Sequence, residues 1–351
     1  MNAGRSGYST GTCAAAAAKA AAMVLCGRPA PREIEVSLPD GTRVTLSTVH
    51  ACRRNAEAEV AVRKDAGDDV DVTHGAMVSV SVSFAEGGDV TFAAGEGVGT
   101  VTRPGLVIPP GEPAINPVPR GMIQAAVREV TDRPIKVTIS IPGGRKLAER
   151  TFNPRLGVAG GLSILGTTGR VRPFSLPALR EALKCSLGVA AGCGVLSPVL
   201  VPGRIGEKAA REHFRLSTQQ VIEVGNEWGF ILDHIPDYRF ERVLVLGHPG
   251  KLAKLAMGQW DTHSARSSRA VPYVVDLAAR VLGRTPPECP TVEGIFGALP
   301  AADRATLAAD LAGKVREEVM RRVRRQSGAA VALVDMRGDL LGSDGDTIPW
   351  R

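Results

Sequence analysis

The chain has 351 residues, and 44% of them are hydrophobic, which is ordinary for a globular protein in water. This length exceeds the size at which one hydrophobic core stops growing, so it predicts two domains. The formal net charge is +7, but residues 314–325 hold six basic side chains against two acidic ones. The excess therefore mostly describes one solvated helix face. With only 4% aromatic residues available to stack on bases, we expect no nucleic-acid partner.

Cysteine usage and the N-terminal run both argue against secretion and against a membrane. The six cysteines form no C-x-x-C pair, so they indicate neither a zinc site nor a disulfide framework. We therefore expect a reducing cytoplasm and no protein-bound metal. The alanine-rich run at 14–25 is interrupted by Lys19 and is too short to cross a bilayer. It predicts an amphipathic helix of a soluble protein with no membrane partner.

In chain order, a helix that begins near residue 10 comes first. Ser9 or Thr10 is placed to cap it, and Gly27 followed by Pro29 would end it. Thr10 and Thr12 then lie at a helix N-terminus, where unpaired amides and the positive end of the helix dipole favour an anion such as a substrate carboxylate. Plain capping is the alternative explanation.

The next part of the chain has the pattern of a sheet. Residues 33–94 alternate apolar with polar or small side chains in short runs separated by turn signals, which predicts a largely antiparallel sheet with one solvated face. A helix from about residue 120 to 131 and a strand at 135–141 follow a long loop. We therefore predict that residues 1–155 form an α+β domain.

The second half of the chain has a different period. Strands that are apolar on both faces and alternate with helices indicate a parallel sheet covered on both sides. The sequence therefore predicts that residues 156–351 form a doubly wound, Rossmann-like α/β domain. The strands are expected at 195–201, 221–224, 243–246 and 330–335.

An acid-rich turn at 64–75 contains four carboxylates within seven residues. It fails the EF-hand calcium pattern, because its glycine falls one place late and Val80 stands where the closing glutamate belongs. Such a cluster repels itself unless it is solvated or bonded to donors. Either this is a solvated turn, or Asp68 or Asp69 faces a cationic or N–H-bearing ligand.

Two glycine-rich passages are the candidate walls of a binding site. In residues 95–120, eleven of the 26 residues are Gly or Pro, so most of this stretch is neither helix nor regular strand. Its few charges and its apolar residues argue against disorder, and long ordered loops are usually functional. The second passage is residues 157–169. The arginines in or beside the two passages are Arg103, Arg120, Arg170 and Arg172.

The stretch 243–254 reads as a buried strand, a Gly-x-x-Gly turn and a helix. In such sheets ligands bind beyond the carboxyl ends of the strands, where glycines let a ligand approach the main chain. The full G-x-G-x-x-G pattern is missing, so a dinucleotide is disfavoured, whereas an adenosyl cofactor stays open. The candidate cofactor-binding residues are Gly247, His248, Gly250 and Lys251, and those of the other glycine-rich loop are Gly160 and Gly161.

Asp261 and His263 follow that helix and could join His248 at the same edge of the sheet. Two histidines and an aspartate suit acid/base chemistry, whereas a lone histidine is more often a hydrogen-bonded structural residue. A hydrolase triad is disfavoured, because the chain has no G-x-S-x-G turn. The candidate catalytic residues are His263, Asp261 and Asp68.

Several stretches together resemble one known family. Their ranges are Gly7 to Cys13, Lys64 to Asp69, Gly95 to Arg120, Gly160 to Gly169, Gly247 to Ala256 and Asp261 to Ser264. This set resembles the cobalt-precorrin-5B C1-methyltransferase family of anaerobic cobalamin biosynthesis. Val70 departs from the family, which usually has proline there, so the resemblance implies the charge of the acid-rich turn but not its exact shape.

The resemblance implies methyl transfer from S-adenosylmethionine to C-1 of a cobalt-containing tetrapyrrole, which converts cobalt-precorrin-5B to cobalt-precorrin-6A. The sulfonium is already activated, so the reaction asks for alignment and exclusion of water rather than a triad. The cobalt enters with the substrate and needs no protein ligand. Arginines in forked geometry suit the acetate and propionate arms of such a macrocycle. The expected substrate-binding residues are Thr10, Thr12, Arg103, Arg120, Arg170 and Arg172.

Two other function classes stay open. A small-molecule kinase or similar enzyme could cradle phosphate with residues 95–100 or 160–169, but the chain lacks a Walker lysine, and tight Mg-dependent ATP binding would distinguish this class. A non-catalytic tetrapyrrole carrier would bind the pigment without affinity for the methyl donor. A homo-oligomer is compatible with each class.

Overall fold

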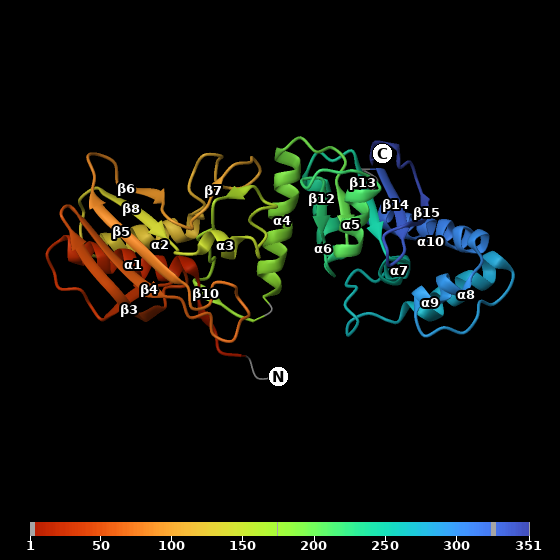
Figure 1. The fold of residues 1–351 in the computed structure, drawn as a ribbon, viewed down its shortest axis with the longest axis horizontal. Helices are drawn as coiled ribbons and strands as arrows, with labels where there is room; N and C mark the ends of the chain where they lie inside the picture. Colours follow the sequence, from red (N-terminus) through yellow and green to blue (C-terminus); the bar gives the residue numbers. More distant parts are fainter. Residues whose placement is uncertain (1–3, 174, 324–327, 351) are drawn as a thin grey trace. The chain divides into compact units, whose positions relative to one another are not determined.

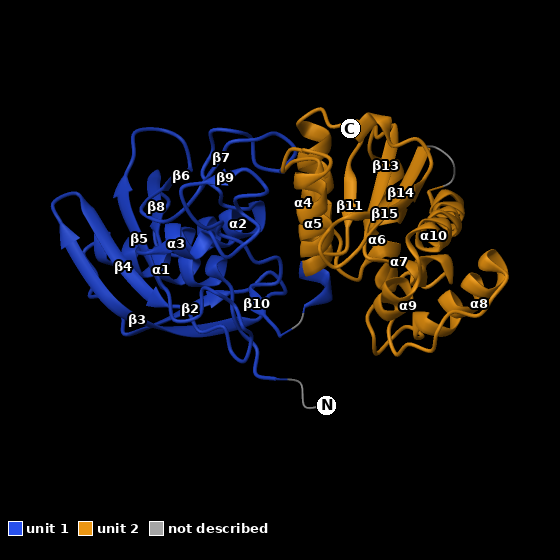
Figure 2. Ribbon diagram, turned by 45° about the vertical axis from the view of Figure 1, so that its right-hand side comes forward, with its two compact units in different colours: residues 1–178 blue, residues 179–351 orange. Residues whose placement is uncertain are grey.

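The structure, a computed structural model, describes residues 4–173, 175–323 and 328–350 (Figure 1). The chain divides into two compact units, Met1–Ala178 and Leu179–Arg351 (Figure 2). This division lies later than the boundary expected at residue 155. The reason is that the second glycine-rich passage bonds to the first unit: the amide of Ser9 donates to the carbonyl of Gly169 at 2.9 Å, and the amide of Thr102 donates to that of Gly157 at 2.7 Å.

Unit 1 is built on a six-stranded sheet in the order β2-β3-β4-β5-β8-β6 (Figure 1). All neighbouring pairs are antiparallel except β6 and β8, as the period-two pattern predicts. On β5, Val78, Val80 and Val82 are fully buried, whereas the serines between them are partly exposed. The strands are β2 (Glu33–Ser37), β3 (Arg43–Arg54), β4 (Glu57–Arg63), β5 (Met77–Phe84), β6 (Val90–Ala94) and β8 (Ile135–Ser140).

The first helix, α1 (Thr10–Leu25), lies at the centre of unit 1. The prediction that this helix is amphipathic is wrong, because 13 of its 16 residues are buried. It packs against strands β3, β4 and β5 and also against helix α2 (Pro117–Arg128). A helix enclosed in this way has no solvated face, and alanine lets its neighbours approach closely. The end of the helix is as predicted, since Gly27 follows it with a positive φ of 82°.

Short elements join the loops of unit 1. Residues 7–8 pair with residues 170–171, just after the second glycine-rich passage, and the two glycine-rich passages pair with each other. Helix α2 begins at Pro117, so the long loop is shorter than expected and ends at its N-cap, Asn116. These elements are β1 (Gly7–Tyr8), β7 (Thr100–Val101), α3 (Gly144–Ala148), β9 (Val158–Ala159) and β10 (Arg170–Val171).

Unit 2 contains a five-stranded sheet in the order β12-β11-β13-β14-β15. The first four strands are parallel, and β15 is an antiparallel edge strand that the sequence did not predict. Both faces are buried: Leu200 and Val243 belong to one core, and Val199 and Leu244 belong to the other. Assignment to the Rossmann-like class stays a prediction. The strands are β11 (Val199–Val201), β12 (Val221–Glu223), β13 (Arg242–Gly247), β14 (Gly328–Val334) and β15 (Leu340–Asp344).

Helices cover the two faces of this sheet. Helix α5 packs with the core of one face, whereas residues of α6, α7 and α10 belong to the core of the other. Helix α4 begins just before the division between the units. The helices are α4 (Leu176–Gly192), α5 (Arg204–Glu212), α6 (Trp228–His234), η1 (Ile235–Asp237), α7 (Pro249–Ala256), α8 (Ala270–Leu282), α9 (Val292–Ala298), α10 (Ala301–Arg322) and η2 (Ile348–Trp350).

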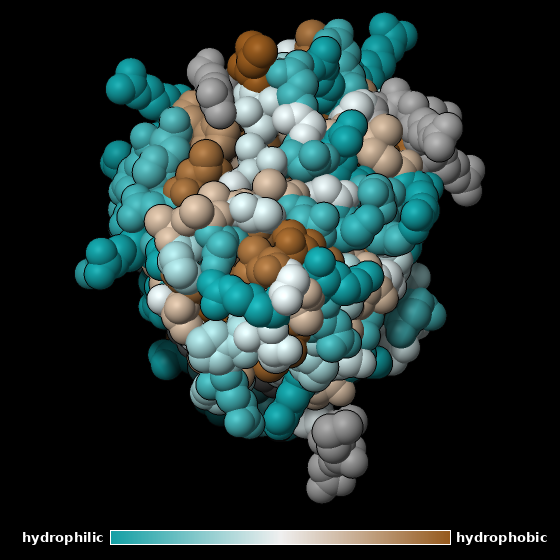
Figure 3. Space-filling model, turned by 90° about the vertical axis from the view of Figure 1, so that its right-hand side faces the viewer, coloured by the Kyte–Doolittle hydropathy of each residue, from teal (hydrophilic) through white to brown (hydrophobic). Residues whose placement is uncertain are grey.

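The basic stretch of α10 is largely paired with acids. Arg322 forms two hydrogen bonds to the carboxylate of Asp233, at 2.8 and 2.7 Å, and Arg316 pairs with Asp344 at 3.1 Å. Arg324 and Arg325 lie outside the described residues. On the face drawn in Figure 3, hydrophilic residues predominate and apolar residues form small separate groups. Within the described ranges, no helix is long and apolar enough to cross a membrane.

The enclosure of α1 can be tested by overpacking. Ala17 is fully buried, so Ala17→Leu should lower the free energy of unfolding by about 1–3 kcal/mol. Urea denaturation followed by circular dichroism measures this. The matched control, Ala51→Leu, places the same methyl groups at an exposed position of β3 and should change stability by less than about 0.5 kcal/mol. Equal stability of the two variants would contradict the packing described for α1.

Candidate functional site

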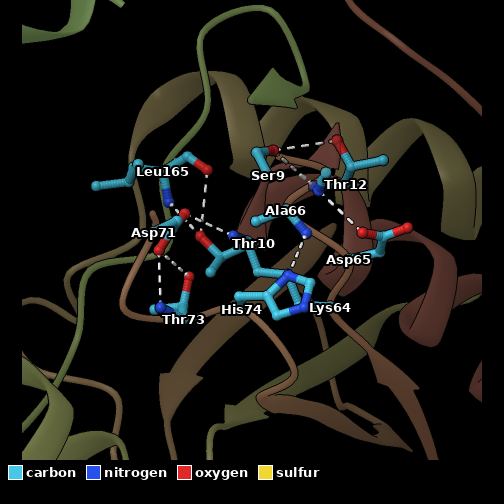
Figure 4. Close-up of polar contacts among 11 residues, drawn as sticks. Ser9, Thr10, Thr12, Lys64, Asp65, Ala66, Asp71, Thr73, His74 and Leu165 are labelled. Atoms are coloured by element: carbon cyan, nitrogen blue, oxygen red, sulfur yellow. Dashed lines mark hydrogen bonds and ion pairs between the residues drawn. The ribbon is translucent and has the colours of Figure 1, made fainter. Parts of the chain in front are cut away.

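Three stretches that are distant in sequence meet at the N-terminus of α1 (Figure 4). Ser9 caps the helix, because its Oγ accepts the amide of Thr12 at 3.1 Å. The hydroxyl of Thr10 donates to the carbonyl of Leu165 at 3.2 Å and accepts the amide of the same residue at 3.1 Å. The hydroxyl of Thr12 donates to the carbonyl of Gly169 at 2.6 Å. The two threonines thus hold the second glycine-rich passage against the helix.

The first amides of α1 also have partners inside the protein. The amide of Gly11 donates to the carbonyl of Leu165 at 3.1 Å, and the amide of Thr12 is taken by the Ser9 cap. Thr10 and Thr12 are at most 4% exposed. The capping explanation therefore accounts for these residues, and direct binding of a substrate carboxylate by Thr10 and Thr12 stays a prediction.

A buried ion pair lies beside this junction. Lys64 is 1% exposed, and its Nζ lies 2.6 Å from Oδ2 of Asp71 (Figure 4). The other oxygen of Asp71 accepts the amide and the hydroxyl of Thr73 at 2.7 and 2.6 Å. Burial raises the pKa of Asp71, but the hydrogen bond and charge of Lys64 and the bonds from Thr73 outweigh burial and hold this pKa below its ordinary value.

The sequence analysis missed this ion pair, although the chain carries a signal for it. Val60 and Val62 face the core from β4, and Lys64 follows them in the same period-two phase. A lysine at such a position must be buried, so it needs an acidic partner nearby. The alternation, extended by one residue beyond the end of β4, would have found it.

The carboxylates Asp65 and Asp68 bind the N-terminal segment. The guanidinium of Arg5 donates to both oxygens of Asp65, at 2.5 and 2.8 Å, and the main-chain amide of Arg5 donates to Asp68 at 2.6 Å. The hydrogen bond from Arg5, followed by the one from the amide of Gly67, lowers the pKa of Asp65 to about 2. Gly67 has a φ of +66°, and a Cβ there would overlap with the carbonyl oxygen of Arg5. A catalytic role of Asp68 stays a prediction.

The two glycine-rich passages touch through their main chains. A Cβ on Gly161 would overlap with the carbonyl of Gly97, and a Cβ on Gly99 would lie 2.9 Å from the carbonyl oxygen of Gly161. In contrast, a Cβ on Gly160 would meet nothing within 4 Å. Gly161 is therefore required for packing, whereas Gly160 faces open space.

The four arginines beside these passages fall into two groups. Arg120 donates from Nε to the carbonyl of Ile115 at 2.9 Å and from Nη2 to Glu112 at 3.2 Å, and Arg103 donates to the carbonyl of Arg155 at 3.3 Å. Arg120 thus contacts its own loop, whereas Arg103 joins its loop to residue 155, just before the second passage. The structure leaves Arg172 exposed and Arg170 partly exposed, and within the described part of the chain neither side chain forms an ion pair.

In unit 2, His248 caps α7. Its Nδ1 accepts the amide of Gly250 at 3.0 Å, so Nε2 carries the proton and donates to Glu293 at 2.6 Å. A Cβ on Gly247 would lie 2.7 Å from the ring of Pro202, so this glycine accommodates a neighbouring loop. His248, Gly250 and Glu293 line a cavity of about 370 Å³ together with Lys254, Arg269, Ala270, Val271, Pro290, Thr291 and Val292.

The segment after α7 is held by its own contacts. Asp261 accepts the amide of His263 at 3.0 Å and pairs with Arg266 at 2.8 Å. His263 is exposed, and its Nδ1 accepts the amide of Ala265 at 3.2 Å. His263 does not line the cavity that contains His248, so a joint catalytic role of these residues stays a prediction. The residues described include no group of three or more His, Cys, Asp or Glu that could hold a metal ion.

Breaking the buried pair should destabilise unit 1. Lys64→Met removes the charge that compensates the carboxylate of Asp71, and loss of one partner of a buried pair costs about 3 kcal/mol or more. Urea unfolding of the variant measures this loss. The double variant Lys64→Met/Asp71→Asn should recover part of the stability, because it leaves no unpaired charge. A single variant as stable as the parent would contradict the burial of this pair.

The Arg5–Asp65 pair should be visible in a pH titration. The pKa of about 2 for Asp65 lies below the ordinary value of about 3.9, so the pair stabilises the fold above about pH 4 and this contribution is lost as the pH falls toward 2. Arg5→Ala should raise the pKa of Asp65, measured by carboxyl-carbon NMR. An unchanged pKa would show that Arg5 is not the cause.

Comparison with known proteins assigns the chain to a family. A family model described as CbiD matches residues 1–173. The cobalt-precorrin-5B C(1)-methyltransferase of Syntrophotalea carbinolica is 54% identical over 98% of this chain and 98% of that protein. The protein of the same name from Moorella thermoacetica is 42% identical over 97% and 95%. A crystal structure of the cobalamin biosynthesis protein (cbiD) from Archaeoglobus fulgidus is 27% identical over 75% of this chain and 83% of that chain, with a TM-score of 0.41, too low to compare the folds. The chain therefore belongs to the CbiD family of cobalt-precorrin-5B C(1)-methyltransferases.

Proposed function

We propose that this protein transfers a methyl group from S-adenosylmethionine to C-1 of cobalt-precorrin-5B in cobalamin biosynthesis. One observation carries the proposal: a relative named cobalt-precorrin-5B C(1)-methyltransferase is 54% identical along 98% of the chain. The product would be cobalt-precorrin-6A, and the cobalt belongs to the substrate. The names of the relatives favour this function over a phosphate-binding enzyme or a tetrapyrrole carrier.

The chemistry demands little of acid/base groups. When bound, S-adenosylmethionine supplies an electrophilic methyl group: its C–S bond breaks with the electron pair left on sulfur, while a C–C bond forms with an electron pair from the macrocycle. The protein contributes alignment and exclusion of water. The bonds of His248 to Gly250 and Glu293 already account for its two ring nitrogens, which agrees with a structural role.

The residues beyond the carboxyl end of β13 fit an adenosyl methyl donor. Lys251 lies in the first turn of α7 and offers a cation for the carboxylate of the donor. Burial, followed by the charge of Lys254, lowers the pKa of Lys251. An anionic partner would therefore stabilise the charged, ammonium form of this side chain. Gly247 cannot approach a ligand on the side that Pro202 occupies, so we assign it to packing. Gly160 and Gly161 are the alternative donor loop.

The carboxylate arms of the macrocycle would be bound by arginines that have no ion pair of their own. Arg172 and Arg170 meet this condition within the described residues. Arg120 holds its own loop, and Arg103 bonds to the carbonyl of Arg155, so both would shape the wall indirectly. Thr10 and Thr12 would position residues 165–169 rather than touch the substrate.

We further propose that the protein acts in the cytoplasm, where its six free cysteines would stay reduced, and that any homo-oligomer forms without covalent links.

The function is tested by label transfer. Purified protein is incubated with methyl-labelled S-adenosylmethionine and cobalt-precorrin-5B, and the label is located by NMR. Label at C-1 supports the proposal. Pigment binding without donor binding would support a carrier instead, and Mg-dependent ATP binding without methyl transfer would support a phosphate-handling enzyme.

The proposed contact between Arg172 and a carboxylate arm of the substrate can be tested with the variant Arg172→Ala. Loss of a charge-assisted bond should weaken binding of cobalt-precorrin-5B by about 10- to 150-fold, measured by pigment fluorescence or absorbance titration. Arg172→Lys should recover only part, because an ammonium lacks the forked geometry. The control is Arg150→Ala, which removes an exposed arginine outside these passages and should bind normally. Equal affinity of the Arg172 and Arg150 variants would remove Arg172 from the site.

A further inference from the structure

One cavity of unit 2 lies where three helices begin. The N-caps of α7, α8 and α9 are His248, Arg269 and Thr291, and all three residues line the same cavity of about 370 Å³. His248 directly follows β13, so the cavity lies beyond the carboxyl end of a parallel strand, where such sheets bind ligands. Its volume falls within the range of small-molecule sites.

A base and an acid line this cavity with hydrogen-bonding groups that have no partner. Arg269 is exposed, and its side chain forms no hydrogen bond or ion pair within the described residues. Glu293 accepts the hydrogen bond of His248 with Oε2 at 2.6 Å, whereas its Oε1 has no partner in that part of the chain. Arg269 and Glu293 form no ion pair with each other, so both can bind a ligand.

The segment that carries Arg269 is held in place before a ligand arrives. Nζ of Lys254 donates to Oγ of Ser267 at 2.7 Å, and the amide of Ser268 donates to the side chain of Gln259 at 2.8 Å. These bonds fix the main chain on the N-terminal side of Arg269, which reduces the ordering cost of binding. Lys254 also lines the cavity and adds a second positive charge.

The rest of the cavity wall is largely apolar. It consists of Gly250, Ala270, Val271, Pro290 and Val292. The cavity thus combines an apolar wall with one cation and one anion that do not neutralise each other. A ligand that carries both charges close together, on an otherwise uncharged body, matches this arrangement, and an α-amino-acid group is such a ligand part.

We propose that this cavity binds the methionyl end of the methyl donor, with Arg269 pairing with its α-carboxylate and Oε1 of Glu293 accepting a hydrogen bond from its α-ammonium. The guanidinium of an arginine can hold a carboxylate through two parallel hydrogen bonds, and a carboxylate with one oxygen occupied still accepts with the other. This inference rests on the proposed function and goes beyond it. Lys251 does not line the cavity, so the carboxylate of the donor is assigned to Arg269 instead.

Calorimetric titration of the full chain with three thioethers tests the assignment. S-adenosylhomocysteine carries both charges, its decarboxylated form keeps only the ammonium, and 5′-methylthioadenosine has neither. Arg269→Ala should weaken binding of the first by about tenfold or more without weakening the other two, and Arg269→Lys should recover part of the loss. Glu293→Gln should weaken the first two and spare the third, because glutamine can still accept the bond of His248 but has no charge.

Two matched controls keep the cavity intact. Arg280→Ala removes an exposed arginine in the last turn of α8, at the opposite end of that helix from Arg269. Glu288→Gln changes an exposed glutamate that does not line the cavity. Both controls should bind all three ligands as the parent protein does.

The outcomes separate this inference from the proposed function. The assignment is overturned, even where label transfer to the corrin precursor succeeds, if the parent protein binds methylthioadenosine as tightly as S-adenosylhomocysteine. It is also overturned if Arg269→Ala binds S-adenosylhomocysteine like the Arg280 control, if it weakens all three ligands equally, or if Lys251→Met weakens that ligand and Arg269→Ala does not. The first measurement needs no variant, so it does not depend on the folding of one. If the parent protein neither binds S-adenosylmethionine nor transfers the label, the proposed function itself fails, and the assignment falls with it.

Discussion

Unit 1 depends on main-chain contacts that are too close for any side chain. Gly7 passes against the main chain of Ala66, Gly67 passes against that of Arg5, and Gly161 lies on Gly97. A Cβ at any of the three glycines would overlap with its neighbour. These contacts bring three stretches of the chain to the N-terminus of α1, and the hydroxyls that line this turn then have carbonyls within reach. The glycines of these loops therefore act first as packing residues.

The acid-rich turn shows how the same junction deals with charge. Three acids of this turn accept hydrogen bonds from separate donor groups. The guanidinium of Arg5 donates to Asp65, the main-chain amide of Arg5 donates to Asp68, and Lys64 donates to Asp71. The repulsion expected among neighbouring carboxylates is thereby offset by two cations, Arg5 from the N-terminal segment and Lys64 from the turn itself, and by the main-chain amide that Asp68 accepts. Because Lys64 is buried, its pair with Asp71 is screened less by solvent than the exposed pair of Arg5 and Asp65. The turn is held in shape from both ends.

In unit 2, two glycines likewise allow close packing at the edge of the parallel sheet: Gly206 lies against the carbonyl of Leu246, and Gly247 lies against the ring of Pro202. Gly206 and Gly247 let the turn after β11 rest on the end of β13. This arrangement is suited to a reaction in which the protein mainly aligns two large ligands, because methyl transfer from a sulfonium needs a fixed approach more than a proton relay.

The sequence by itself determined the period of the main strands in both units and the resemblance to a family. Alternation in β5 and the cap and stop of α1 follow from local rules that need no distant contact. It could not show that α1 is enclosed, since an alanine-rich helix looks the same in either setting until its neighbours are known. Nor could it show that Arg120 bonds to Glu112 within its own loop, while Arg172 forms no ion pair among the described residues. These facts depend on which loops lie side by side, and only the tertiary structure decided that, because contacts between residues far apart in the chain are set by packing and not by local preference.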